Sequence, residues 1–128
     1  MSNILSHTNW RLHRVEGCTQ AARWLHQNHT GVVVCARELA DGDWRRLWER
    51  IRTDAACPAF VVGARLADEE LWGEVLNLGC YDLLEIPFEP EEALRVIAAG
   101  LRSWRWEQER LRNKPRAAAA AALGASIA

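Results

Sequence analysis

Two short, continuously apolar runs rich in valine constrain the fold of this chain more than any other feature. They are GVVVCA at 31–36 and AFVVGA at 59–64. Because polar residues do not alternate with apolar ones in either run, both are expected to be strands covered on both faces, as in a parallel sheet. We place 31–36 at the centre of that sheet. A shorter strand is expected at 81–86, and a half-buried one at 10–15, where large apolar and polar side chains alternate.

Amphipathic segments separate these strands and predict helices. Their ranges are 18–28, 44–52, 68–79 and 87–112. Cys18 or Thr19 is expected to cap the first of these helices, Asp68 to cap the third, and Gly79 to end it. Strands that alternate with helices of this length predict βαβ units with right-handed crossovers. The predicted fold class is therefore α/β, with a doubly wound parallel sheet.

The size and charge of the chain limit its organisation and its partners. A sequence of 128 residues is expected to form one domain, and a net charge of -1 gives no general attraction to nucleic acid or anionic membrane. No apolar run approaches the ~20 residues of a membrane span, so we expect a cytoplasmic protein. The domain is assigned to 1–113. Pro115 is expected to stop the last helix, which leaves the alanine-rich segment 114–128 as a disordered tail or linker.

Several residues of chemically versatile types are better explained by structural roles. The four cysteines are far apart in the sequence and are expected to be small buried side chains. His26 and His29 could chelate a metal only with a third ligand, and a solvated position near a helix C-terminus is preferred for them. Asp41 and Asp43 are expected to form a turn and a helix cap rather than a cation site. We therefore predict no metal and no cofactor.

Three stretches together resemble the receiver domain of response regulators. They are VVVCARELADGDW at 32–44, LWGEVLNLGCYDLL at 71–84 and IPFEPEE at 86–92. The first is similar to the third strand and acidic loop of that family, the second to its fourth helix and fifth strand, and the third to its Lys-Pro-Phe loop. The resemblance covers residues 10–112 and implies a flavodoxin-like receiver architecture.

The resemblance also shows where the chemistry of the family is missing. In receiver domains a carboxylate takes a phosphoryl group, a hydroxyl and a lysine contact that group, and two further carboxylates hold Mg²⁺. The matching positions here hold Ala36, Ala64 and Ile86. The first strand of the family, which supplies the two carboxylates, is expected to be missing because nine residues precede Trp10. The resemblance thus implies about four strands and no phosphoryl transfer.

We therefore predict a phosphorylation-independent, receiver-like signalling module that is not an enzyme. It is expected to act by protein–protein contact in a two-component, phosphorelay type of system. The candidate contact residues lie on the face that the fourth helix, fifth strand and last helix form in the family: Trp72, Tyr81, Leu84 and Phe88. The sheet edge left by the missing strand, or the last helix, is the expected site of any homo-oligomer.

Two other functions stay open at this point. One is a small α/β protein that binds a nucleotide or a flavin at the switch point of its sheet, although neither a Gly-x-Gly-x-x-Gly nor a Gly-Lys-Ser/Thr loop is present. The other is nucleic-acid binding through residues 102–116, which contain six basic and two acidic residues. A solvated helix end explains this segment more simply, so neither nucleic acid nor a membrane is the expected partner.

Overall fold

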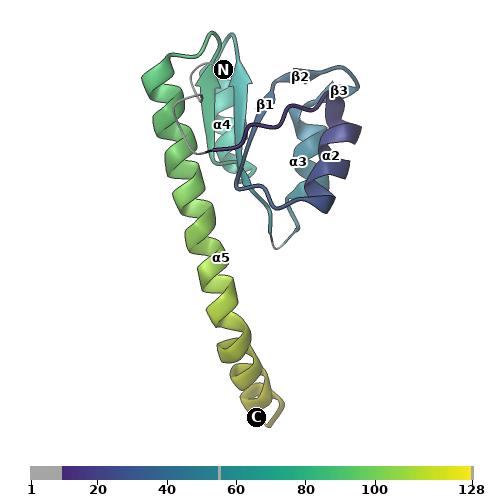
Figure 1. Cartoon of the computed structure of the whole chain (residues 1–128), viewed down its shortest axis with the longest axis vertical. Helices are drawn as coiled ribbons and strands as arrows, with labels where there is room; N and C mark the ends of the chain where they lie inside the picture. The colour runs from purple at the N-terminus through teal and green to yellow at the C-terminus, as the bar shows by residue number, and fades with distance from the viewer. Residues whose placement is uncertain (1–9, 55, 128) are drawn as a thin grey trace.

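The computed structural model describes residues 10–54 and 56–127. Helices and strands alternate along this part of the chain (Figure 1). In order, they are α2 (Gly17–Gln27), β1 (Val32–Ala36), β2 (Glu38–Leu39), β3 (Gly42–Asp43), α3 (Trp44–Ile51), β4 (Ala59–Ala64), α4 (Glu69–Asn77), β5 (Asp82–Glu85) and α5 (Pro90–Ile127). The predicted helices and three of the four predicted strands are confirmed.

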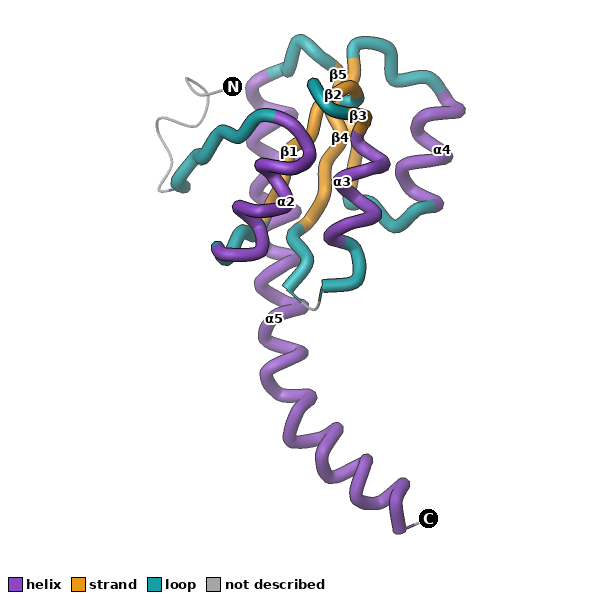
Figure 2. Tube along the Cα trace, turned by 90° about the vertical axis from the view of Figure 1, so that its right-hand side faces the viewer, coloured by secondary structure: helices purple, strands orange, loops and turns teal. Residues whose placement is uncertain are grey.

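A parallel sheet in the order β1-β4-β5 forms the middle layer of the fold. In Figure 2, α2 and α3 lie in front of this sheet and α5 lies behind it. Successive side chains of β4 point to opposite faces of the sheet and pack against different helices, because side chains alternate across a strand. Phe60 and Val62 pack with α2, α3 and α4, whereas Val61 packs with Ala93 and Val96 of α5. The α/β class and the parallel sheet are confirmed.

The predicted central position of 31–36 is wrong. β4 is the central strand, and β1 lies at one edge of the sheet, where β4 is its single partner among the described residues. The continuous valine run fits this edge position because α5 and the helices of the other layer still cover its two faces. Hydrophobic burial of a strand therefore indicates covered faces and does not indicate paired edges.

The predicted strand at 10–15 is also wrong, so within residues 10–54 and 56–127 the main sheet has three strands rather than four. These residues carry no strand, and Leu12 and Val15 are 45% and 38% exposed. The segment is instead held against α2, where the ring of His13 stacks on Trp24 with centroids 3.4 Å apart. In the part of the chain that the structure describes, this segment joins no sheet, so its alternating pattern did not mark a buried face.

The predicted caps of α2 are replaced by a residue distant in the sequence. Asp41, in the turn between β2 and β3, accepts hydrogen bonds from the backbone N–H of Cys18 (2.6 Å) and of Thr19 (3.2 Å). Gly17 has a φ of +76°, and a Cβ there would lie 2.9 Å from the Asp41 carboxylate. Neither Cys18 nor Thr19 caps the helix, because the carboxylate of Asp41 already satisfies its first donors.

The other predicted helix ends agree with the structure. Asp68 accepts a hydrogen bond from the backbone N–H of Leu71 at 2.8 Å and so caps α4, and Gly79 follows the helix with a φ of +89°. Asp43 caps α3 in the same way through the N–H of Arg45, at 3.0 Å.

Helix α5 starts at Pro90 but does not stop at Pro115. It continues to Ile127 and extends well past the sheet (Figure 1). Alanine has the highest helix propensity, and the alanine-rich sequence after Pro115 favours this continuation. The stop at Pro115 is therefore wrong, whereas the division into a domain at 1–113 and a tail at 114–128 stays a prediction.

The Asp41 cap predicts a pH-dependent loss of stability. Replacing Asp41 by Ala should lower the urea midpoint at pH 7, because the first N–H groups of α2 lose their acceptor. Their hydrogen bonds hold the pKa of the Asp41 carboxyl below its usual range. The stabilisation is therefore complete above the unfolded pKa of about 3.9 and is lost as the pH falls through the lower folded pKa. Urea unfolding should show the difference from wild type shrinking over that range.

The matched control is Glu38→Ala, on the two-stranded ribbon that β2 and β3 form with the Asp41 turn between them. The Glu38 side chain is exposed and makes no hydrogen bond or ion pair with the described residues. An equal loss of stability in both variants would show that Asp41 is not a specific cap.

Candidate functional site

The carboxyl ends of the three parallel strands form the edge where a doubly wound sheet usually carries its site. Ala36 ends β1 and is exposed, Ala64 ends β4 and is 2% exposed, and Ile86 follows β5 and is part-buried. All three positions that were compared with the receiver family thus come to the same edge. None of them supplies a nucleophile, a hydroxyl or a cation.

The side chains after β5 close this edge with apolar surface. A Cβ at Gly63 of β4 would lie 3.3 Å from the ring of Phe88 and 3.4 Å from Ile86. Ile86 therefore packs over the end of β4. The lysine that receiver domains have at this position would place a charge there. The position compared with the lysine of the receiver family therefore holds an apolar side chain and no cation.

The two aspartates beside this edge already make structural hydrogen bonds. Asp41 caps α2, and Asp43 both caps α3 and pairs with Arg45 through its second oxygen at 2.6 Å. Among the described residues no group of three His, Cys, Asp or Glu side chains is arranged to hold a metal ion. The two aspartates therefore act in the fold as the sequence indicated, in a turn and in a cap.

Arg45 connects this acidic ribbon to α4. Its guanidinium donates to both carboxylate oxygens of Glu74, and it also lies 5.1 Å from the ring centre of Trp44. The hydrogen bonds from Arg45 hold the pKa of Glu74 below its usual range. Such bidentate pairs have a fixed geometry, so Arg45 sets the position of α3 relative to α4.

The cysteines are not reactive groups in this structure. Burial raises the pKa of Cys35 and of Cys80 to about 12, and that of Cys57 to about 11. Cys18 is fully buried. Because the thiolate is the reactive form, the three thiols with raised pKa values stay protonated and inert at neutral pH.

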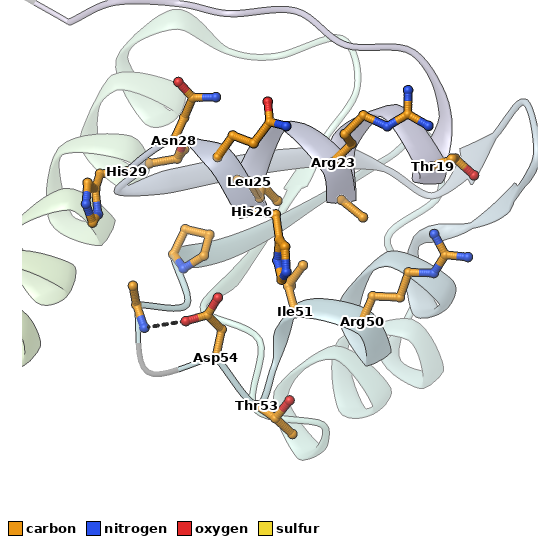
Figure 3. A pocket seen from close by; sticks show the side chains of 15 residues that line it. Thr19, Arg23, Leu25, His26, Asn28, His29, Arg50, Ile51, Thr53 and Asp54 are labelled. Atoms are coloured by element: carbon orange, nitrogen blue, oxygen red, sulfur yellow. Dashed lines mark hydrogen bonds between the residues drawn. The ribbon is translucent and has the colours of Figure 1, made fainter.

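A groove of about 850 Å³ lies at the opposite end of the sheet, beside the starts of β1 and β4 (Figure 3). Its walls are the α2 and α3 helices, with Arg23 and His26 from the first and Arg50 from the second. Asp54, below them, accepts a hydrogen bond from the backbone N–H of Ala56 at 2.9 Å. The sequence did not indicate this groove, because its walls come from segments that are far apart along the chain.

The structure separates the four predicted partner contacts. Trp72 is 36% exposed on α4, whereas Tyr81 and Phe88 are part-buried against the cluster beneath α5. Leu84 is 2% exposed and cannot contact a partner directly. Sequence reasoning missed Leu76, which is 52% exposed one turn after Trp72 on the same face of α4.

Comparison with known proteins gives matches at the level of structure alone. No protein-family model matches the sequence, and no curated protein matches it. The signal receiver domain of a Luxo repressor protein from Vibrio parahaemolyticus is 15% identical, with a TM-score of 0.77 over 84% of this chain and 82% of that one. The receiver domain of an HD domain-containing protein from Pseudomonas fluorescens Pf-5 is 25% identical, with a TM-score of 0.76 over 85% and 81%.

A third solved structure gives the same result. It is a response regulator from Chloroflexus aurantiacus, 19% identical, with a TM-score of 0.72 over 79% of this chain and 84% of that one. The chain therefore has the flavodoxin-like fold of response-regulator receiver domains, as the sequence resemblance implied. Within the described residues, no helix combines the length and hydropathy that a membrane span needs.

The Arg45 bridge predicts a modest and salt-sensitive contribution to stability. Glu74→Gln should lower the free energy of unfolding by about 0.5–1 kcal/mol, since the Glu74 side chain is 33% exposed and the pair is partly screened by water. The loss should be smaller in 1 M salt. Urea unfolding at two salt concentrations measures both effects.

Glu49→Gln provides the comparison. Glu49 pairs with Arg52 at 3.1 Å on one helix, and its side chain is 58% exposed, so its loss should be close to zero. If both substitutions cost the same, the bridge between α3 and α4 has no special role.

Proposed function

We propose that this chain is a receiver-like signalling module that works without phosphorylation, through contact with a protein partner in a two-component or phosphorelay system of the cytoplasm. One observation carries the proposal. Ala36, Ala64 and Ile86, which stand where the family has its acceptor, hydroxyl and lysine, are apolar, while the neighbouring aspartates are held in helix caps. The receiver-domain fold of the matched structures supports a signalling role for the scaffold.

Phosphoryl transfer needs a charged or polar group at each of these positions. An attacking carboxylate supplies the oxygen, and a cation and a metal ion neutralise the charge that develops on the transferred group. Ala36 has no oxygen to offer, and Ile86 has no charge. The proposed module therefore transmits information by which partner it binds rather than by a covalent modification of its own.

The partner surface is proposed on α4 and the chain that flanks it. Trp72 and Leu76 are exposed on one face of α4, and Leu66, just before the helix, is 76% exposed. A tryptophan surrounded by exposed aliphatic side chains is typical of the residues that dominate binding at protein interfaces. Tyr81 and Phe88 are proposed to support this surface from its rim.

Incubation with acetyl phosphate tests the absence of phosphorylation. Wild-type protein with Mg²⁺ and radiolabelled acetyl phosphate should incorporate no label, because no carboxylate stands at the end of β1. Addition of beryllium fluoride, which mimics a bound phosphoryl group, should leave tryptophan fluorescence unchanged. A receiver domain with an intact aspartate is the positive control, and label on the present chain would overturn the proposal.

Unfolding measurements test whether Trp72 is available to contact a partner or packs in the hydrophobic core. Trp72→Ala should lower the free energy of unfolding by roughly 1–2 kcal/mol, because Trp72 is 36% exposed and contributes only part of the burial of a core side chain. Trp48→Ala should cost about 3–5 kcal/mol, since Trp48 is 7% exposed and its indole N–H donates to the Leu78 carbonyl at 2.9 Å. Similar losses in the two variants would make Trp72 a packing residue and remove the centre of the proposed surface.

A further inference from the structure

The outer edge of β1 is the longer of the two unpaired edges of the main sheet, as far as the described residues show. Within residues 10–54 and 56–127, β1 pairs with β4 and with no other strand. Its three valines are only part-buried, whereas Val61 and Val62 of the central strand have no exposed surface. An apolar edge strand presents a row of unpaired N–H and C=O groups, which is a template for pairing with another chain.

Hydrogen bonds show which groups of β1 point outward. The N–H of Arg37 donates to the Gly63 carbonyl, and the carbonyl of Gly31 accepts from the N–H of Ala59, both at 2.8 Å. In a parallel ladder, successive residues alternate between the two sides of a strand. The odd-numbered residues of β1 therefore face β4, and the N–H and C=O groups of Val32, Val34 and Ala36 face away from it.

β1 itself carries none of the usual blocks against pairing with another strand. Exposed edges are usually blocked by charged side chains, proline or a bulge. The strand contains no charge and no proline, and its register with β4 is continuous from Val32 to Ala36. By contrast β5, at the other edge, is four residues long and carries Asp82 and Glu85 at its ends. Residues 10–16 cross the outer side of β1 in Figures 1 and 2, so this segment must move aside for a second copy to reach the edge.

We propose that two copies of this chain pair through β1, antiparallel, about a two-fold axis at Val34. In that register Val34 lies opposite its own symmetry mate, and Val32 lies opposite Ala36 of the second copy. Each outward N–H then meets an outward C=O, because antiparallel partners exchange both groups. The two three-stranded sheets become one continuous sheet.

The second copy fits this edge because the edge is complementary to itself. The same register places Arg37 opposite Gly31 and Glu38 opposite Thr30, so no two like charges face each other across the pair. An isologous contact of this kind closes after two subunits and does not continue into a fibre. The pairing rests on the backbone of β1 and does not depend on the proposed signalling function.

Sedimentation at several protein concentrations tests the proposal with two variants of one exposed residue. Ala36→Pro removes an outward N–H and places a ring on the edge, while the bonds to β4, made by the neighbouring residues, are kept. Wild type and Ala36→Thr, which keeps the N–H, should show twice the mass of the chain at high concentration. Ala36→Pro should show half of that mass under the same conditions.

Several results would overturn the pairing. One is a wild-type protein that is monomeric at all concentrations. Another is an Ala36→Pro protein that dimerises as wild type does, which would place the contact elsewhere, such as on α5. Hydrogen exchange of wild-type protein provides a test that needs no variant. The amides of Val34 and Ala36 should exchange several-fold more slowly at high concentration than at low concentration. Unchanged exchange at both concentrations would contradict the pairing even if the variants fail to fold.

Discussion

The structure depends on the burial of β4 between two layers of helices. Phe60, Val61 and Val62 are at most 1% exposed, and they direct alternate side chains into the clusters on the two faces of the sheet. Full burial of side chains of this size contributes about 1.5–3 kcal/mol each, which no surface interaction in the chain approaches. The helices on both faces and the strands on both edges are positioned by this one strand.

A second constraint comes from the ribbon between β1 and α3. Its two aspartates hold the first turns of two different helices, and Arg45 then connects the second helix to α4. A carboxylate that accepts two backbone N–H bonds is fixed in position and stays ionised at neutral pH. Acidic residues that cap helices in this way are not free to bind a metal ion. The two aspartates therefore stabilise the fold and do not form a reaction site.

Much of the fold could be predicted from periodicity. The stripes of 44–52 and 68–79 and the apolar runs at 31–36 and 59–64 each gave the correct element, because a continuous covered face leaves a clear pattern in the sequence. The position of a strand within the sheet leaves no such pattern. This is why the central place assigned to 31–36 was wrong, and why the alternation at 10–15 indicated a strand where the structure has none.

The candidate site was predictable in part for a related reason. Counting from a recognisable motif located Ala36, Ala64 and Ile86 correctly at one edge of the sheet, since register along a strand is local information. The role of Asp41 depends on a contact with Cys18, 23 positions away, and only the folded chain shows it. Because the same fold can hold an aspartate either as a reagent or as a cap, the motif identifies the scaffold and the contacts of each side chain decide its chemistry.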